Sequence, residues 1–288
     1  MPIYRFEPTV PDESRLSRLA DFLRSVFPNA LCFSPEYLHW MYFRNPDGAV
    51  TGIEGYAGDT LVGHHAVIPI RIQHDGVERP AGLAVNISTD PAHRGHGLFR
   101  ELTSTTHAAF EATGRDLVIA VANDQSTDRS IQRLSYRLVG PLDARLGLAG
   151  ECLDLATDGR SAFRRLWSPE SFAWRFSNPS WFYRFERNDS VTRVYTPTRR
   201  FAIEAEMGVF PGDWPLPAQK RRYPLLRHPL KLWLGLRPGA GEHWPVSMEI
   251  PRPLRPSPLN LIVRDSRAGA EPPAHDRVAF RGADFDPY

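Results

Sequence analysis

Hydrophobic and polar residues alternate over residues 3–9, as in a short strand, and residues 11–27 then adopt the three- and four-residue spacing of an amphipathic helix. That spacing brings five apolar residues to one helical face: Leu16, Leu19, Phe22, Leu23 and Val26. A second helix is predicted in residues 34–45, because Ser34 is a favourable N-cap and Pro46 cannot continue a helix. The chain therefore begins with one strand and two helices.

Three strand patterns follow in direct succession, at residues 51–59, 60–72 and 81–89. Gly58-Asp59 separates the first two strands, and His74-Asp75-Gly76 separates the second from the third. These residues favour tight turns, so we expect the three strands to form an antiparallel meander.

Beyond the meander, the pattern predicts two further helices that alternate with two strands. The first helix spans residues 98–111 and ends before Gly114. Residues 116–123 are almost uniformly apolar, which is typical of a strand inside a sheet. A short helix at residues 126–136 and a strand at residues 137–148 complete the first half of the chain.

The second half of the chain differs in composition, because proline is frequent in residues 211–258. Strand patterns remain at residues 181–187, 190–195, 201–210 and 259–265. Ser-Pro-Glu followed by a tryptophan occurs in the same register from Ser34 and from Ser168. Either two related units are present, or a capped helix with a packing tryptophan arose twice. We expect two domains, residues 1–148 and a smaller α+β domain in residues 149–288, for which a degenerate copy of the first is one hypothesis.

Composition excludes several functional classes. The 288 residues are 42% hydrophobic and 24% charged, enough for one large or two modest cores. A net charge of +2 gives no broad field that would attract nucleic acid, and no apolar run approaches the roughly 20 residues that span a bilayer. Cys32 and Cys152 match neither a disulfide framework nor a metal site. We therefore expect a cytoplasmic protein with no metal, no nucleic-acid partner and no stable membrane insertion.

The glycine-rich segment at residues 94–99 lies at the start of the third predicted helix. A helix N-terminus leaves backbone N–H groups unpaired and concentrates partial positive charge. Gly95 and Gly97 tolerate positive φ, so successive amides can face one anion, and Arg94 adds donors for phosphate oxygens. The segment predicts a diphosphate site or a purely structural turn. It is not a Rossmann fingerprint, because Arg100 stands at the third glycine position.

The segment DPAHRGHGLFREL resembles the acyl-CoA-binding motif of the GNAT superfamily of N-acetyltransferases, usually Arg/Gln-x-x-Gly-x-Gly/Ala. Arg94 and Gly97 match the first and fourth positions, whereas Phe99 stands where a small residue is usual. Residues 123–140 also resemble a later family segment, in which an Asn ends a strand and a short helix leads to a Gly-Phe-like pair. The resemblance covers roughly residues 1–148.

This resemblance implies an α/β fold with a mixed, mostly antiparallel central sheet flanked by helices. It also implies transfer of an acetyl or related acyl group from acetyl-CoA or another acyl-CoA. In the family, the strand before the glycine turn separates from its neighbour and pairs with the pantetheine arm. The residues that the resemblance assigns to acyl-CoA are Ile87, Ser88 and Thr89 for the arm, Arg94, Gly95, His96, Gly97, Leu98 and Phe99 around the diphosphate, and Asn123 at the far end of the arm.

Direct attack of an amine on the thioester requires a base for the amine proton and an acid for the departing thiolate. Ile131 occupies the position at which many family members carry a tyrosine as the acid. Asp90, His65 and Tyr136 are the catalytic candidates, although Asp90 beside a proline also suits a turn and strand histidines are often structural. Further titratable groups on the meander strands are Glu54, Tyr56 and His64.

The expected acceptor is a small-molecule amine or a sugar-type compound, with a hydroxyl as the alternative nucleophile. Aromatic residues at 37, 40, 42 and 43 either line its pocket or belong to the core. Basic residues at 164, 165 and 220–222 either attract an anionic acceptor or form a solvated surface.

Two alternative functions remain open at the level of sequence. A non-catalytic acyl-CoA-binding or scaffold protein is supported by the missing tyrosine at Ile131. Residues 223–238 are apolar enough for an interfacial membrane contact, but their prolines argue against a long amphipathic helix.

Overall fold

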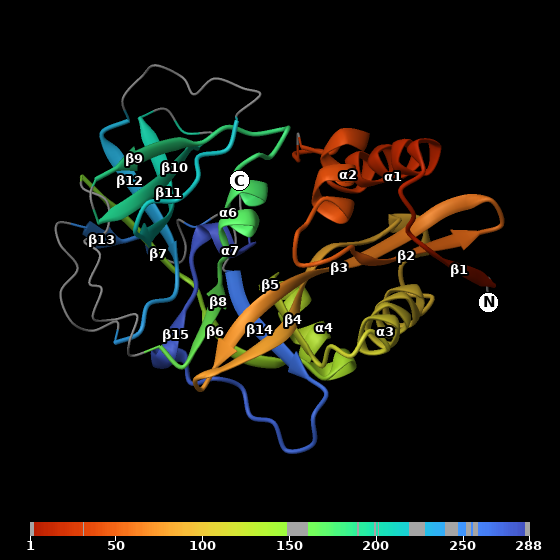
Figure 1. The fold of residues 1–288 in the computed structure, drawn as a ribbon. Coiled ribbons are helices and arrows are strands. Elements are labelled where there is room, and N and C mark those ends of the chain that lie inside the picture. The colour runs from red at the N-terminus through yellow and green to blue at the C-terminus, as the bar shows by residue number, and fades with distance from the viewer. Residues whose placement is uncertain are drawn as a thin grey trace.

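Two adjacent β-sheets, with helices on both faces of the first, make up the fold (Figure 1). The computed structural model describes residues 3–30, 32–148, 161–188, 190–198, 200, 202–218, 228–239, 247–251, 255 and 259–285. Within these residues the expected mixed α/β class with mostly antiparallel sheets is confirmed.

The first half of the chain follows the predicted order of elements. They are β1 (Tyr4–Pro8), α1 (Glu13–Val26), α2 (Pro35–Phe43), β2 (Thr51–Ala57), β3 (Thr60–His74), β4 (Val77–Thr89), the short 3₁₀ helix η1 (Pro91–His93), α3 (Leu98–Glu111), β5 (Leu117–Asn123), α4 (Asp124–Leu134), β6 (Arg137–Pro141) and β7 (Asp143–Gly147). Ser34 caps α2 as expected, because its hydroxyl accepts from the Tyr37 amide at 3.1 Å.

The second half adds a further set of strands and two short helices. They are β8 (Phe163–Leu166), α6 (Pro169–Arg175), β9 (Arg184–Arg187), β10 (Val191–Pro197), β11 (Ile203–Pro211), β12 (Leu230–Gly235), β13 (Ser247–Glu249), β14 (Leu259–Asp265), the 3₁₀ helix η3 (His275–Arg277), β15 (Val278–Ala279) and α7 (Gly282–Phe285). The four predicted strands correspond to β9, β10, β11 and β14. The hydrophobic pattern did not predict β8, β12, β13 or β15.

The first sheet has the strand order β1-β2-β3-β4-β5-β14-β6, and β8 pairs with the far end of β3 and with β15. The meander β2-β3-β4 is antiparallel as predicted, whereas β4 and β5 are parallel. β14 runs antiparallel to both β5 and β6, between which it lies. A strand from near the end of the chain therefore completes the sheet that the first half begins.

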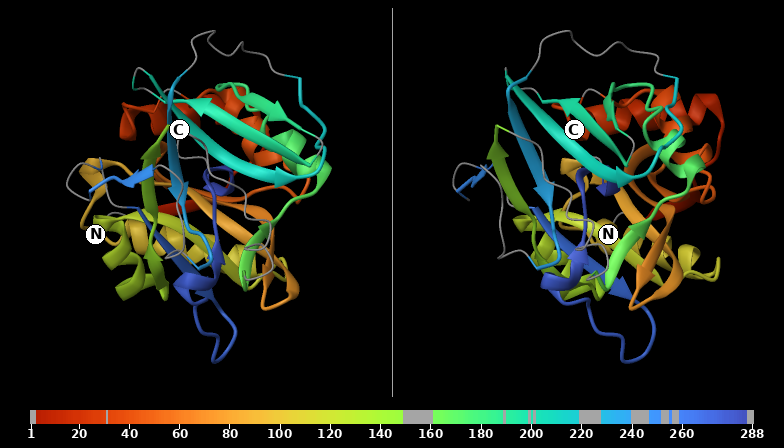
Figure 2. Two further views of the ribbon diagram at one scale, coloured as in Figure 1. Left: turned by 90° about the vertical axis from the view of Figure 1, so that its left-hand side faces the viewer. Right: turned by 60° about the vertical axis from the view of Figure 1, so that its left-hand side comes forward.

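The second sheet has the order β13-β7-β12-β11-β10-β9 (Figure 2). Residues 137–148 were predicted as one strand, and this prediction is wrong, because the segment divides at Leu142 into β6 of the first sheet and β7 of the second. Leu142 is buried and its amide donates to the Leu259 carbonyl at 2.7 Å, which holds the chain where it changes sheets. Each half of the chain thus contributes a strand to the sheet that is formed mainly by the other half. A division into two domains at residue 148 stays a prediction.

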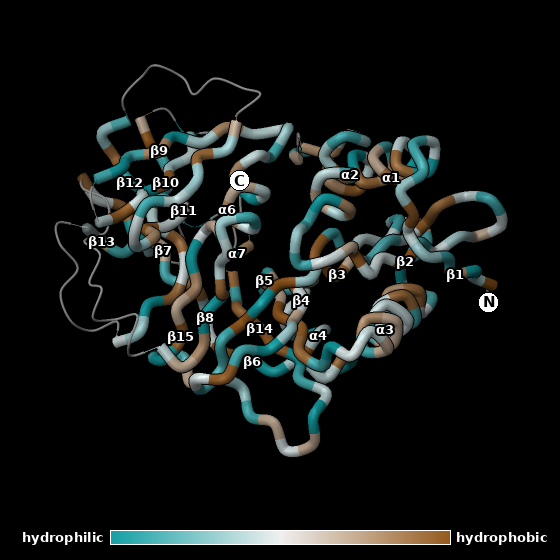
Figure 3. The backbone as a smooth tube through the Cα atoms, in the orientation of Figure 1, coloured by the Kyte–Doolittle hydropathy of each residue, from teal (hydrophilic) through white to brown (hydrophobic). Residues whose placement is uncertain are grey.

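Helices α1 and α2 pack on one face of the first sheet, and α3 and α4 pack on the other (Figure 1). Hydrophobic residues concentrate in the central strands between these layers (Figure 3). Gly82 in β4 allows the closest approach, because a Cβ there would lie 2.6 Å from the Phe110 ring of α3 and 2.3 Å from Val67. The fit of α3 against β4 thus requires glycine at this position.

The two repeated segments meet each other in the core, as helices α2 and α6. The rings of Trp40 and Trp174 stack with centroids 5.2 Å apart. Each indole Nε1 donates to the backbone carbonyl of the other tryptophan at 3.0 Å. The contact is reciprocal, so equivalent residues of the repeat occupy equivalent environments. A common origin of the two units nevertheless stays a prediction.

Candidate functional site

The ends of β4 and β5 separate from each other. Their parallel ladder covers only Ala81–Leu83 paired with Leu117–Ile119, although the strands continue to Thr89 and Asn123. The remainder of β4 stays paired with β3, and β5 stays paired with β14 along its whole length. A wedge-shaped gap therefore opens within the first sheet.

A β-bulge at Asn86 accompanies this separation. The register of β4 on β3 shifts between the pairs His64↔Ser88 and Ala66↔Val85, and Asn86 has the left-handed backbone conformation with φ 54°. A bulge bends its strand and changes the direction of the side chains. Asn86 is among the few residue types that tolerate this conformation. The bulge therefore bends β4 where it leaves β5.

A cavity of about 470 Å³ occupies the gap. Phe99, Ser130 and Tyr136 border it on the face that carries α3 and α4. Phe27, the residue after α1, and Phe285 of α7 border it on the opposite side. Both sheet faces thus contribute to one cavity, whose size lies in the range of small-molecule sites.

The glycine turn lies at one end of this cavity, because Phe99 belongs to both. Gly95 and Gly97 have φ values of 81° and 85°, and Gly97 is the N-cap of α3 without a side-chain hydrogen bond. In the described part of the chain, no acceptor pairs with the amides of Gly95, His96 or Gly97. A Cβ placed on Gly95 would meet no atom within 4 Å. The turn is thus an open set of unpaired donors next to the exposed side chain of Arg94.

The predicted contacts of the pantetheine arm agree with the cavity only in part. Ile87 and Asn123 line it, but Ser88 and Thr89 pair with β3 and do not. Val85 and Asn86, immediately upstream, line the cavity instead, and sequence reasoning missed both. An asparagine inside a strand pattern was the available signal, because it indicates a bulge. The bulge shifts the set of cavity residues toward the start of β4.

Asn123 has a local role in addition to its place beside the cavity. Its Oδ1 accepts from the Ser126 amide at 2.9 Å and from the Ser126 hydroxyl at 2.8 Å, which makes it the N-cap of α4. The side chain that the resemblance assigned to the far end of the arm is therefore fixed in position by α4.

Of the three catalytic candidates, only Tyr136 lines the cavity. Its hydroxyl lies 3.0 Å from Nε2 of His107, and burial raises the pKa of Tyr136. Asp90 accepts from the Ala92 amide at 2.8 Å and caps η1, the turn-shaping role that the adjacent proline indicated. His65 is completely buried beside His107, and burial lowers the pKa of His65 well below its usual value. The structure therefore brings neither Asp90 nor His65 to the cavity.

A buried row of polar groups holds Asn86 on the face that carries α1 and α2. Nδ2 of Asn86 lies 2.7 Å from the Tyr42 hydroxyl, which lies 2.8 Å from Nε2 of His64. Nδ1 of His64 donates to the Ile53 carbonyl at 3.1 Å, because a carbonyl oxygen can only accept. Burial lowers the pKa of His64 to about 3, so the ring is neutral and its Nε2 accepts from Tyr42. The Tyr42 oxygen in turn accepts from Asn86, which fixes the carboxamide beside the cavity.

Glu54 and Tyr56 form a separate cluster away from the cavity. The buried Glu54 carboxylate accepts from the Tyr56 hydroxyl at 2.5 Å and from Arg15 of α1 at 2.9 Å. This arrangement attaches α1 to β2. The aromatic residues Tyr37, Trp40 and Tyr42 of α2 are likewise buried in the core.

The described residues also bear on metal binding and on membrane insertion. No group of three or more His, Cys, Asp or Glu side chains there could hold a metal ion. No helix among them has both the length and the apolar character to cross a membrane. Lys220, Arg221 and Arg222 and the first part of the 223–238 segment lie outside the described residues.

Comparison with known proteins adds a family assignment. Residues 12–132 match the family model of the acetyltransferase (GNAT) domain. No curated protein matches the chain in a sequence search. Two solved structures share the fold over most of the chain. One is a conserved protein of unknown function from Enterococcus faecalis V583, described as a probable N-acyltransferase, with TM-score 0.62, 8% identity and coverage of 92% of this chain and 73% of the other.

The second solved structure is a GCN5-related N-acetyltransferase from Anabaena variabilis ATCC 29413, with TM-score 0.60, 12% identity and coverage of 91% and 73%. At such low identities these likenesses establish the fold alone. The family model covers both the glycine turn and the separated ends of β4 and β5. The chain therefore carries an acetyltransferase domain of the GNAT superfamily at residues 12–132.

Proposed function

We propose that the protein transfers an acyl group from acyl-CoA to an amine of a small-molecule or sugar-type acceptor, with a hydroxyl as the alternative nucleophile. The observation that carries this proposal is the continuity of two features. An open turn of unpaired amides adjoins a cavity of about 470 Å³ between two separated strands. An acyl donor that has a phosphorylated end and a long polar arm, as acyl-CoA does, suits this combination.

The diphosphate of acyl-CoA belongs at the glycine turn. Amides around Gly95 and Gly97 supply several donors to one anion, and the N-terminus of α3 adds partial positive charge. Arg94 is exposed beside them and adds charge-assisted hydrogen bonds. Phe99, the departure from the family motif, borders the cavity, so its ring faces the start of the arm.

The pantetheine arm belongs in the gap between β4 and β5. Strands that separate expose backbone N–H and C=O groups, which an extended arm with its own amides can satisfy as an added strand does. Val85 and Ile87 on β4 and Val121 on β5 border the path. The thioester then lies near Asn86, where the bulge places a polar group in a largely apolar cavity.

Tyr136 is the candidate acid for the departing thiolate. Among the three catalytic candidates it is the one that borders the cavity, and its raised pKa keeps it protonated at neutral pH. In the reaction, the amine nitrogen bonds to the thioester carbon, the carbon–sulfur bond breaks, and a proton reaches the sulfur. The nitrogen must be neutral to attack, so its proton leaves to solvent or to a base that the acceptor brings near.

The proposal is tested by thiol release with acetyl-CoA and a panel of amines, together with calorimetry of CoA binding. We expect free CoA to appear with at least one amine. Tyr136→Phe should lower kcat by about 10²-fold and leave the affinity for CoA unchanged, because it removes only the proton donor. Tyr56→Phe, which removes a phenol away from the cavity, is the matched control.

Arg94→Ala tests the placement of the diphosphate. We expect the affinity for CoA to fall about tenfold, because a charged hydrogen-bond donor is lost. Unchanged affinity would show that the diphosphate lies elsewhere. CoA binding without turnover across a broad panel would favour the second candidate function, a non-catalytic acyl-CoA-binding protein, which Ile131 at the usual acid position supports.

A further inference from the structure

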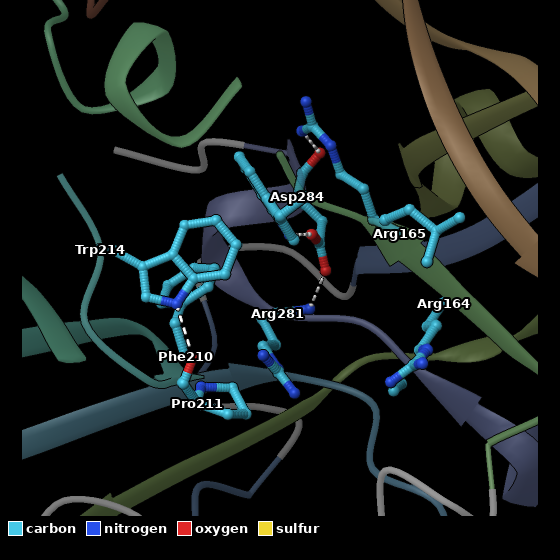
Figure 4. A pocket seen from close by; sticks show the side chains of 10 residues that line it. Arg164, Arg165, Phe210, Pro211, Trp214, Arg281 and Asp284 are labelled. Atoms are coloured by element: carbon cyan, nitrogen blue, oxygen red, sulfur yellow. Dashed lines mark hydrogen bonds between the residues drawn. The ribbon is translucent and has the colours of Figure 1, made fainter. Parts of the chain in front are cut away.

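A second cavity of about 240 Å³ lies at the junction of the two sheets (Figure 4). Three stretches of chain border it: residues 164–167 at the end of β8, residues 210–214 at and just after the end of β11, and residues 279–284 around α7. None of its lining residues borders the cavity between β4 and β5. The junction cavity is therefore a separate feature that acyl-CoA binding does not explain.

Aromatic rings form much of its wall. Trp167 and Phe210 meet edge to face with centroids 5.6 Å apart, and Phe210 and Trp214 lie 5.8 Å apart. Nε1 of Trp214 donates to the Pro211 carbonyl at 2.8 Å, which holds the half-exposed indole in place. Figure 4 shows Trp214 and Pro211 on the side of the cavity opposite Arg164. The rings thus form a fixed apolar surface that suits a flat partner.

Three arginines border the same cavity, and hydrogen bonds fix the position of each. Arg164 donates from Nε to the Gln73 side chain at 2.8 Å, and Arg281 donates from Nη1 to the Val209 carbonyl at 2.7 Å. Arg165 donates from Nη1 to the Asp284 carbonyl at 3.4 Å. Held guanidinium groups lose little entropy when they bind a carboxylate, so the cavity is preorganised for an anion.

Asp284 is the only acid among the lining residues, and both of its carboxylate oxygens are engaged. Oδ1 accepts from Nε1 of Trp167 at 3.2 Å, and Oδ2 accepts from the backbone amide of Arg281 at 2.7 Å. Both donors are neutral groups. Three guanidinium groups and one carboxylate thus line the cavity.

Arg165 carries a buried charge, which Asp284 and Asp47 partly offset. Arg165 is 5% exposed, and its guanidinium carbon lies 4.0 Å from the centroid of the Trp167 ring. Nε and Nη2 of Arg165 have no hydrogen-bond partner among the described residues. Burial lowers the pKa of Arg165 to about 10, so it stays charged at neutral pH. A nearby anion would offset the cost of burying this charge.

The volume limits the size of the occupant. About 240 Å³ corresponds to roughly eight water molecules at about 30 Å³ each, so a compound of about ten non-hydrogen atoms fits. That is the size of one aromatic ring with one acid group. A nucleotide or a CoA molecule would extend beyond the cavity.

We infer that the junction cavity binds a small aromatic carboxylic acid, whose ring lies against Trp167, Phe210 and Trp214 and whose carboxylate faces Arg164 and Arg281. This inference goes beyond the proposed acyl transfer and does not depend on it. The two cavities are nevertheless neighbours, because Asp284 borders this one and the next residue, Phe285, borders the other.

The test titrates benzoate, benzamide and cyclohexanecarboxylate into the full chain in the absence of acyl-CoA. Calorimetry and tryptophan fluorescence measure the binding. We expect saturable binding of benzoate, at least about tenfold weaker binding of the neutral benzamide, and weaker binding of the non-planar acid. Equal affinities for benzoate and benzamide, or no saturation with benzoate, would overturn the inference. Neither outcome bears on the acyl-CoA proposal, because the titrations contain no acyl-CoA.

Variants locate the binding to this cavity. Arg281→Gln should weaken benzoate binding about tenfold, because it removes a charged donor. Arg137→Gln is the matched control, since Arg137 is exposed and pairs with Glu271 outside the cavity. Trp214→Ala, which removes a half-exposed ring from the cavity wall, is the second test variant. It replaces Arg281→Gln if a thermal melt shows that Arg281→Gln does not fold. Retained affinity in both cavity variants, or equal loss in the control, contradicts the inference.

Discussion

Single residues decide the shape of the candidate site at three points of positive φ. Gly95 and Gly97 turn the backbone so that amides face outward, and Asn86 places the bulge where β4 leaves β5. Glycine adopts this conformation without a steric cost, and asparagine is among the few others that adopt it readily. The glycines were predictable from the sequence because their conformational freedom is a property of the residue itself. The position of the bulge depended on the pairing with β3.

Substitution of Gly97 by alanine tests the turn at this scale. The change forces a Cβ into a backbone with φ 85°, which costs about 1–2 kcal/mol and moves the amides. We expect the affinity for CoA to fall about tenfold or more, measured by calorimetry. Gly76→Ala is the matched control, because Gly76 has φ 80° with open space around it in the turn between β3 and β4. An equal loss in both variants would mean that strain alone, not the site, is responsible.

His65 gives a second prediction at the residue scale. Both ring nitrogens are buried without a partner among the described residues, so His65→Leu should raise the free energy of unfolding by about 1 kcal/mol at pH 7. The pKa of His65 is lower in the folded chain than in the unfolded chain. Only the unfolded state therefore takes up the proton as pH falls below about 6.5, and the wild type loses stability there.

The gain from His65→Leu should therefore grow between pH 7 and pH 5, as measured by urea unfolding at each pH. Transferase activity should persist, because His65 lies outside the cavity. A gain that shrinks at low pH would show that the folded histidine binds a proton. Loss of turnover with intact CoA binding would restore His65 as a catalytic candidate.

At the scale of elements, β14 shows how a distant segment becomes part of the site. It pairs with β5 over seven residues and contributes Leu259 and Ile262 to the cavity. An ion pair attaches the end of β14 to β4, because the Asp265 carboxylate accepts a hydrogen bond from Arg79 at 2.7 Å. Its strand character was predictable from the apolar run, but its place beside β5 was not, since an apolar pattern does not specify the pairing partner.

Asp265→Asn tests this attachment. Burial alone would raise the pKa of Asp265, but hydrogen bonds from Arg79 and Arg267 outweigh it and lower the pKa. The carboxylate therefore contributes stability above the unfolded pKa of about 4, and this contribution is lost as pH falls below that value. We expect a loss of about 2 kcal/mol in the free energy of unfolding at neutral pH, because Arg79 loses one of its two carboxylate partners and keeps only Asp116.

In urea unfolding, the difference in stability between the Asp265→Asn variant and the wild type should begin to shrink as the pH falls from 5 to 3. Asp59→Asn is the control, because Asp59 is fully exposed and should change stability little. A difference between wild type and variant that stays constant over this pH range would contradict the assigned pKa shift.

At the scale of the whole molecule, the two halves of the chain are joined by exchanged strands and by one reciprocal contact. β7 lies in the second sheet, β14 lies in the first, and Trp40 and Trp174 bond to each other across the interface. Because the halves share strands, we expect them to unfold together.

A double-mutant cycle on Trp40→Phe and Trp174→Phe measures this connection. Each change removes one indole donor from the reciprocal pair, and the two sites are in direct contact. We expect a coupling energy of about 1 kcal/mol in urea unfolding, with a single transition in every variant. A control cycle combines Trp40→Phe with Trp214→Phe, because Trp214 lies at the junction cavity and does not contact Trp40. Additive losses in the first cycle, or two separate transitions, would show that the halves are independent.

The sequence by itself determined the local elements of the first half: two capped helices, the meander, the glycine turn and the helix after it. These depend on side-chain periodicity, caps and backbone freedom, which act over a few neighbouring residues. The divergence of β4 from β5, the split at Leu142, the entry of β14 and the junction cavity were decided only by the tertiary structure. Each of these requires contacts between residues far apart in the chain, and such contacts depend on which surfaces can be buried together rather than on any local period.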